Sequence, residues 1–294
     1  MTVNVSQIER STGLSKDVIR KWEVRYGFPV PSRDKNGDRQ YSDQEVACLK
    51  LIKSLLDKGM RPSKVVGLGK SQLEMLVKDA GTFKSEDAAE IFHKIHPPLK
   101  SGRYDDVRNI ISIQLQRYGV QKFITNVISD LNVLIGDAWL NGDLEIYQEH
   151  IYSEIVIDLL RSSMAMMPHP KEQPTILLTT PPGEPHEIGL RMAQAIFTLN
   201  GASTIALGVQ TPIDDIVQAA ADVCANIVAL SFSVACAKRN TVNFLRELRC
   251  ALPDRVALWA GGEGIAALDA PLQGIHLIAN FDQAIDLLKA YSFK

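Results

Sequence analysis

The pattern of apolar and polar positions divides the chain into three regions with different periods. Residues 1–75 show short helical spacings interrupted by a turn-rich stretch, and residues 86–167 show helical spacing almost throughout. From residue 175 to residue 294, short apolar runs alternate with amphipathic stretches, a pattern typical of a doubly wound, flavodoxin-like (Rossmann-like) parallel sheet. We assign the intervening residues 76–85 and 168–174 to linkers. The sequence therefore predicts a multidomain protein.

The first region has the order helix, turn, helix, hairpin, helix. Apolar spacing predicts two helices within residues 3–26 around a turn at Thr12-Gly13, and Ser15 is placed to cap the second helix, residues 16–25. Asn36-Gly37 predicts a hairpin turn in the basic segment that follows. A helix-turn-helix followed by a basic hairpin predicts an all-α winged DNA-binding domain whose second helix enters the major groove.

Charge is distributed unevenly and supports the same interpretation. Residues 1–75 hold 14 Lys and Arg against 9 Asp and Glu, a balance of +5, so that −7 remains for the rest of a chain whose net charge is −2. A basic end on an otherwise acidic chain predicts a polyanionic partner for that end. The candidate DNA contacts, most of them to phosphates, are Ser15, Lys16, Arg20, Lys21, Arg25, Arg33, Lys35, Arg39 and Tyr41.

The composite of helix-turn-helix, the run Trp22-Glu23-x-Arg25-Tyr26-Gly27 and a wing that ends Arg39-Gln40-Tyr41-Ser42 resembles the MerR family of transcription regulators. This resemblance covers about the first 75 residues. It implies binding to double-stranded promoter DNA.

The helical pattern of residues 86–167 is interrupted at Pro97-Pro98, Gly119 and Asn141-Gly142. These breaks predict about four helices, arranged as an antiparallel four-helix bundle. Within this region nine residues separate Trp139 from the pair Glu149-His150, across a predicted turn between two helices.

Candidate chemistry gathers at the carboxyl ends of three predicted strands, residues 175–179, 227–231 and 256–260. Ligands bind at this edge of parallel sheets, and an imidazole whose second nitrogen is oriented by a carboxylate is a good ligand for a transition metal. The candidate ligand residues are Glu184, His186, Gly189, Ser231, Ser233, Gly261 and Gly262.

The order of these residues, with 41 positions between Gly189 and Ser231 and 27 between Ser233 and Gly261, resembles the cobalamin-binding domain of corrinoid proteins such as methionine synthase and methylmalonyl-CoA mutase. The resemblance implies that His186 is the lower cobalt ligand and that the acidic residue before it hydrogen-bonds its ring. It also implies that the Ser and the Gly pair receive the displaced nucleotide tail. Ser233 departs from the family pattern, which has Leu at that position.

Over nearly its whole length the chain resembles light-sensing, cobalamin-dependent MerR repressors of the CarH and LitR type. The resemblance implies that Trp139, Glu149 and His150 cover the upper face of the corrin. It also implies that adenosylcobalamin, the expected form of cobalamin, assembles a tetramer on an operator in the dark and that light releases the DNA. Leu140 departs from this family, in which a His follows the Trp, and Leu cannot ligate cobalt.

Two alternatives stay open at this point. The first is a repressor of the same architecture that responds to another corrin, another tetrapyrrole or a protein partner, without light. The second is a corrinoid methyl carrier of an enzyme system, which the basic winged domain does not favour. We expect a regulator without catalytic residues that forms a homo-oligomer, a tetramer or a dimer.

Two absences from the sequence narrow the picture further. No apolar run is long enough to span a bilayer and no signal peptide precedes Val3, so we expect a cytoplasmic protein. Four scattered cysteines, without a C-x-x-C pair, indicate neither a disulfide framework nor a thiolate metal site.

Overall fold

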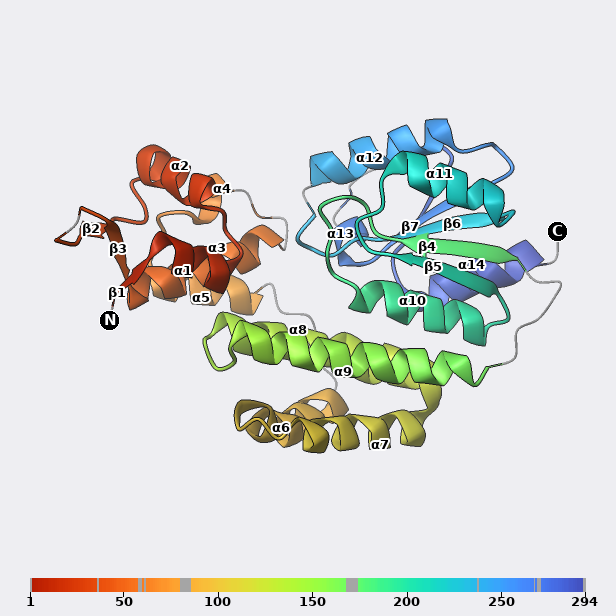
Figure 1. Cartoon of the computed structure of the whole chain (residues 1–294), viewed down its shortest axis with the longest axis horizontal. Coiled ribbons are helices and arrows are strands. Elements are labelled where there is room, and N and C mark those ends of the chain that lie inside the picture. The colour runs from red at the N-terminus through yellow and green to blue at the C-terminus, as the bar shows by residue number, and fades with distance from the viewer. Residues whose placement is uncertain are drawn as a thin grey trace. The chain divides into compact units, whose positions relative to one another are not determined.

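The computed structural model describes residues 2–35, 37–57, 60, 62–79, 86–167, 174–236, 238–266, 268 and 271–292. The chain divides into two compact units, residues 1–101 with 130–151 and residues 102–129 with 152–294. Figure 1 labels the elements in chain order.

The N-terminal region is a winged helix-turn-helix with a small antiparallel sheet of order β1-β3-β2. Its elements are β1 (Thr2–Asn4), α1 (Val5–Thr12), α2 (Lys16–Tyr26), β2 (Ser32–Arg33), β3 (Arg39–Ser42), α3 (Asp43–Asp57), α4 (Pro62–Val65) and α5 (Lys70–Asp79). One apolar core joins α1, α2 and α3 through residues such as Ile8, Trp22 and Ile52. The predicted order of helices and hairpin is confirmed.

Local signals account for the helix boundaries in this region. The hydroxyl of Ser15 accepts the Val18 N–H at 3.3 Å, as predicted for the cap of α2. Ser42 and Glu45 form a reciprocal capping pair at the start of α3. Strand β1 was not predicted, because it has only three residues and its partner, β3, lies far along the chain.

The middle region is helical, as expected, and one of its three predicted breaks, that at Pro97-Pro98, is wrong. Its elements are α6 (Glu86–Lys100), α7 (Tyr104–Phe123), a π-helical turn η1 (Ile124–Ile128), α8 (Ser129–Leu140) and α9 (Ile146–Ala165). Pro97 and Pro98 lie inside α6, which ends before Gly102, a residue with the left-handed φ of 75° that favours glycine. The two prolines keep the φ of a helix but donate no backbone N–H, so they weaken only the last turn of α6.

The break predicted at Gly119 is confirmed, because this residue has a non-helical φ of 69° and ψ of 162° and separates two helical stretches within α7. The break at Asn141-Gly142 is confirmed between α8 and α9. The predicted packing of these helices as one bundle stays a prediction.

The C-terminal region is a doubly wound α/β domain with a parallel sheet of order β5-β4-β6-β7-β8. Its elements are β4 (Thr175–Thr179), α10 (Ile188–Leu199), β5 (Ser203–Gly208), α11 (Ile213–Asp222), β6 (Ile227–Ser231), α12 (Lys238–Ala251), β7 (Ala257–Gly261), α13 (Glu263–Ala266), β8 (Ile275–Ile278) and α14 (Phe281–Ser292). The three strands predicted at residues 175–179, 227–231 and 256–260 are present as β4, β6 and β7, the last of them beginning one residue later than predicted.

Alternate strand residues face opposite sides of this sheet and meet different helices. On one face Val228 and Leu258 pack with Leu245 of α12, and α11 joins them; on the other, Ile176 and Trp259 pack with residues of α10 and α14. Figure 1 shows α11 and α12 on one side of the strands and α10 and α14 on the other. Both faces are apolar, which explains the nearly continuous apolar runs of the strands.

The two predicted linkers are only partly described. Residues 76–79 belong to helix α5, which is a correction to the predicted start of the first linker, whereas 80–85 lie outside the described residues. Of the second linker only Pro174 is described. Among the described residues, no helix combines the length and the apolarity that a membrane crossing needs.

Candidate functional site

The carboxyl edge of the sheet brings three loops together, those after β4, β6 and β7. Thr179 pairs with Leu230, and Ser231 pairs with Gly261, so these strands end side by side. In the strand order β5-β4-β6-β7-β8 the direction of winding reverses between β4 and β6. Ligands of open α/β sheets bind at this reversal. The predicted residues thus lie where the topology favours a site.

His186 and Glu184 form the centre of this edge. The Glu184 carboxylate, with a side chain only 1% exposed, accepts a hydrogen bond from Nδ1 of His186 at 2.5 Å and one from the His186 backbone N–H at 3.0 Å. The His186 side chain itself is 58% exposed. A buried carboxylate therefore fixes the orientation of an exposed imidazole.

The second oxygen of Glu184 is held by the loop after β6. It accepts the Ser233 N–H at 2.8 Å, the Ser233 hydroxyl at 2.6 Å and the Cys236 thiol at 3.0 Å. The Ser233 hydroxyl also lies 3.1 Å from Nδ1 of His186. Ser233, which departs from the family pattern, therefore contacts both Glu184 and His186 directly.

These contacts set the ionisation of the groups involved. Burial alone would raise the pKa of Glu184, but hydrogen bonds from His186, Ser233 and Cys236 outweigh it and lower that pKa to about 2. Burial and the neighbouring carboxylate raise the pKa of Cys236 to about 12. At neutral pH Glu184 is therefore an ionised carboxylate and Cys236 a protonated thiol.

Two glycines of the predicted set lie against neighbouring loops. A Cβ added at Gly189 would stand 2.9 Å from the Ser231 hydroxyl, so the start of α10 and the end of β6 approach closely only because position 189 lacks a side chain. Gly262 has a φ of 99°, and a Cβ there would stand 2.3 Å from the carbonyl oxygen of Phe232. Gly261 is less constrained, because its nearest contact would be 3.6 Å.

The loop that carries His186 is tied down on both sides. Thr180 donates to the carbonyl of Glu184 at 2.6 Å, and the Gln210 N–H donates to the Thr180 hydroxyl at 2.8 Å. Glu187 accepts hydrogen bonds from Arg161 of α9 and from Arg191 of α10, both at 2.7 Å. The residue that follows His186 is therefore bound to two helices.

The predicted cap residues lie at the junction of α8 and α9. Trp139 is half-buried near the end of α8, and Oε2 of Glu149 lies 2.6 Å from Nδ1 of His150, whose side chain is 67% exposed. Leu140 is 8% exposed. The structure thus brings Glu149 and His150 together.

The predicted DNA contacts fall into two groups. Exposed cations are found on α2 and the wing: Arg20, Lys21, Arg25, Arg33 and Lys35. Lys16 is half-buried and pairs with Glu9 at 3.6 Å. Arg39 donates to Glu23 at 3.1 Å, and Tyr41 is fully buried with its hydroxyl 2.5 Å from the same carboxylate. The burial of Tyr41 removes the geometric basis for its predicted contact with DNA, because its ring belongs to the core.

Three residues that sequence reasoning did not single out take part in these sites. Cys236 and Glu23 contact residues predicted for the cofactor and for DNA, and a Cβ added at Gly264 would stand 2.4 Å from the Ser233 carbonyl oxygen. The signal for Gly264 was present in the run Gly261-Gly262-Glu263-Gly264, since a third glycine beside the pair indicates another close backbone approach. The other two contacts are long-range and leave no local pattern.

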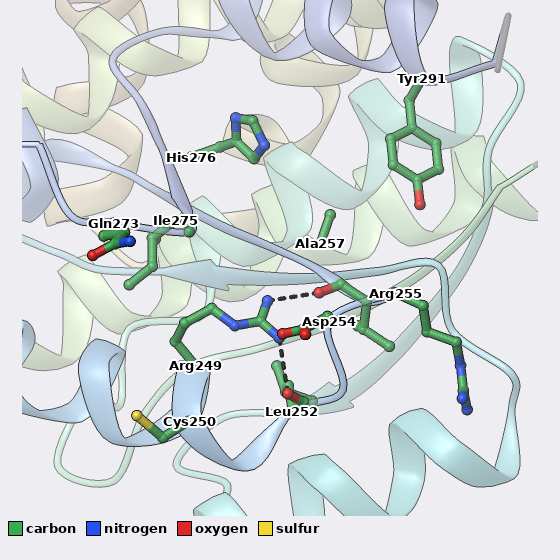
Figure 2. Close-up of a pocket in the computed structure, with 12 residues that line it drawn as sticks. Arg249, Cys250, Leu252, Asp254, Arg255, Ala257, Gln273, Ile275, His276 and Tyr291 are labelled. Atoms are coloured by element: carbon green, nitrogen blue, oxygen red, sulfur yellow. Dashed lines mark hydrogen bonds between the residues drawn. The ribbon is translucent and has the colours of Figure 1, made fainter.

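A depression of about 720 Å³ lies at the opposite edge of the sheet, where β7 and β8 begin (Figure 2). The guanidinium of Arg249 donates there to the carbonyls of Val256 at 2.7 Å, Leu252 at 2.9 Å and Pro253 at 2.8 Å. These bonds close the end of α12. We therefore interpret Arg249 as a structural cap.

Comparisons with known proteins agree with this architecture. The family described as MerR HTH family regulatory protein matches residues 3–71. The HTH-type transcriptional repressor CarH of Myxococcus xanthus is 30% identical over 267 residues, which is 89% of this chain and 89% of that protein. The HTH-type transcriptional repressor CarA of the same organism is 27% identical over 266 residues, 90% of this chain and 88% of that protein.

Among solved structures, the monomethylamine corrinoid protein of Methanosarcina barkeri has a TM-score of 0.52 and 18% identity. The match covers 69% of this chain and 99% of that one. At this identity the likeness concerns the fold alone.

Proposed function

Because the chain belongs to the family of HTH-type transcriptional repressors that includes CarH and CarA, we propose that a corrinoid bound at the carboxyl edge of its α/β domain controls its assembly on DNA. The protein is a DNA-binding transcriptional regulator rather than an enzyme, so the alternative of a corrinoid methyl carrier is set aside. Because its partner is DNA, we also propose a cytoplasmic site of action.

The observation that carries this proposal is the exposed imidazole of His186 on a buried carboxylate. With Nδ1 directed to Glu184, cobalt would bind at Nε2, and the hydrogen bond would keep the ring in the tautomer that binds a metal. Ser233 and Cys236 hold the second oxygen of Glu184, so the carboxylate cannot swing away from the ring.

The close approach of Gly189 to Ser231 supports the same ligand class. A Cβ at position 189 would fill the space beside the Ser231 hydroxyl. Gly189, Ser231, Gly261 and Gly262 would receive the nucleotide tail, with the hydroxyl as its polar partner. We propose adenosylcobalamin as the form bound.

Trp139, Glu149 and His150 would cover the upper side of the bound group. When bound, adenosylcobalamin supplies a cobalt–carbon bond that light can cleave. The protein would respond by a change of oligomeric state, since a ligand shifts such an equilibrium only by its different affinity for the two states. We propose a homo-oligomer, a tetramer or a dimer, as the form that occupies the operator.

The experiment that tests this proposal is a visible absorption spectrum of the full-length protein with adenosylcobalamin, in the dark and after green light. The same samples are sized. We expect a spectrum in which a protein nitrogen replaces the benzimidazole of the cofactor, and a loss of mass after illumination. His186→Ala should abolish the nitrogen-ligated spectrum, whereas His276→Ala, at the opposite edge of the sheet, should leave it unchanged. Full affinity and an unchanged spectrum in His186→Ala would contradict the ligand assignment.

A second candidate rests on Leu140, which stands directly after Trp139 and carries no group that can ligate cobalt. In this alternative the repressor senses another corrin, another tetrapyrrole or a protein partner, and light has no effect. Retained corrinoid without a change of mass on illumination would favour it.

A further inference from the structure

Two carboxylates fasten the wing to the helices of the DNA-binding domain. Glu45 of α3 accepts the Val30 N–H, before the wing, at 2.7 Å, and the N–H of Ser42, the last residue of the wing, at 2.7 Å. Its two oxygens thereby close the base of the hairpin. Glu45 belongs to the capping pair of α3, so this contact is part of the local fold.

Glu23 of α2 makes the other attachment, and it is different in kind. Its side chain is 12% exposed, and it accepts Nε–H of Arg39 at 3.1 Å and the hydroxyl of Tyr41 at 2.5 Å. Both donors come from β3, the inner strand of the wing, which pairs with β1 and β2. One carboxylate of the helix that enters the groove therefore binds two side chains of the wing.

This arrangement is unusual for a surface that should attract phosphates. A carboxylate on the helix that faces DNA repels the phosphate backbone, and by charge alone its removal should strengthen binding. Arg39 is a cation that would otherwise be available to a phosphate, yet its Nε–H is directed to Glu23. A charge in this unfavourable place is explained if it has a geometric task.

We propose that Glu23 is a positioning residue for DNA binding, which holds the wing at a fixed angle to α2 through Arg39 and Tyr41. In this assignment Arg39 is an attachment residue and the exposed cations Arg33 and Lys35 are the phosphate contacts of the wing. Tyr41 contributes its hydroxyl to the attachment from within the core.

The test is the affinity of the full-length protein for DNA after Glu23→Gln. The probe is a 40-base-pair duplex that the wild-type protein selects from a random library, measured with adenosylcobalamin in the dark. We expect binding about tenfold weaker, because glutamine has one acceptor oxygen for the two donors and its amide N–H faces the other, although the variant has one negative charge fewer. An affinity equal to or above that of the wild type would overturn the proposal.

The matched control is Glu74→Gln on α5, which removes the same charge from an exposed pair with Lys70. It should bind the duplex as tightly as the wild type. The far-ultraviolet dichroism and thermal midpoint of both variants show whether the domain remains folded.

Arg39→Gln tests the same attachment from the wing, where the side chain is 36% exposed and folding is less at risk. If Arg39 is an attachment residue, its replacement lowers the affinity for DNA and leaves the salt dependence of binding unchanged. If Arg39 contacts a phosphate, its replacement reduces the slope of log K against log salt by about one. Lys35→Gln should show that reduction. A reduced slope in Arg39→Gln would overturn the proposal.

The double variant Glu23→Gln with Arg39→Gln completes the test. If the two residues act through one contact, it binds no more weakly than the weaker single variant. If the losses of affinity add, Glu23 and Arg39 act independently of each other, which would overturn the proposal. Failure of the wild-type protein to select any duplex would instead count against DNA binding itself.

Discussion

Two regions of this molecule use a glutamate in the same way but in different surroundings. Glu184 in the α/β domain is 1% exposed and accepts from five groups of two loops, including the ring of His186. Glu23 in the winged domain is 12% exposed and accepts from a guanidinium and a phenol of the wing. In each region the carboxylate fixes the position of a part that would meet a ligand, the ring of His186 in the first and the wing in the second.

The two glutamates differ in how many of their hydrogen-bond donors belong to the backbone. Around Glu184 the donors include two backbone N–H groups, and the loops touch through glycines that no other residue can replace without a shift. Around Glu23 both donors are side chains. We therefore expect the loops around Glu184 at the carboxyl edge of the sheet, which we call the socket, to be stiff. The attachment of the wing to α2 through Glu23 should be more adjustable.

The stiffness of the socket is tested most strongly at Gly262. Gly262→Ala should lower the free energy of unfolding of the α/β domain by ~3–5 kcal/mol, because a Cβ would meet a carbonyl oxygen and φ is positive. Gly261→Ala should cost less than ~1 kcal/mol, since its contacts are ordinary. Amide hydrogen exchange of β6 and β7 measures both. Equal losses would contradict the idea of a stiff socket.

Replacing each glutamate with glutamine tests whether the two regions differ in stability as expected. Glu184→Gln should destabilise the apo α/β domain by ~2–3 kcal/mol, because an amide N–H would then face buried donors. Glu23→Gln should destabilise the winged domain by about half as much, because Arg39, one of its two donors, is exposed enough to bond to water instead. Hydrogen exchange within each domain gives the two values. A larger loss at Glu23 would reverse the ranking of the two regions.

A smaller effect is expected from Gly189→Ala, which bears on the corrinoid rather than on the fold. The added methyl group meets the hydroxyl of Ser231, a side-chain atom that can rotate, so stability should change little. Affinity for cobalamin should fall about tenfold, because the space beside the hydroxyl closes. Spectroscopic titration measures the affinity. The double variant with Ser231→Ala should bind no better if the methyl group itself occupies the ligand's space, and better if the displaced hydroxyl is the obstacle.

The smallest effect is expected at Tyr41. Burial and the hydrogen bond to Glu23 raise the pKa of this phenol well above its ordinary value near 10. Since the unfolded state then loses its proton first, the stability that Tyr41 contributes is complete below about pH 10 and is lost as the pH rises further. Tyr41→Phe should cost ~1 kcal/mol at pH 7. Its unfolding free energy should fall less steeply than that of the wild type above pH 10.

Much of this architecture is predictable from the chain because it rests on local patterns. The strands of the α/β domain follow from apolar runs such as Ile227–Ser231, and the winged domain follows from caps and a basic hairpin. The His186 loop is predictable because a strand, a turn and a helix follow one another. The prolines at 97 and 98 misled, since proline near the end of a helix need not end it.

What could not be predicted are contacts between distant residues. Ser233 and Cys236 reach Glu184 across 49 and 52 positions, and nothing in their neighbourhood indicates it. The sequence places Tyr41 among the DNA contacts because it lies near the end of a basic wing, but alternation along a strand does not tell which face meets the core. The structure shows that face to be the one that carries Tyr41.

Helix α9 connects the predicted cap residues with the loop that carries His186. Twenty residues at 1.5 Å per residue make it a rod of about 30 Å, with Glu149 and His150 in its first turns and Arg161 near its last. Arg161 holds Glu187, the neighbour of His186, at 2.7 Å. The backbone of one helix therefore leads from Glu149 and His150 to Arg161, which is the residue of this helix that binds the loop of His186.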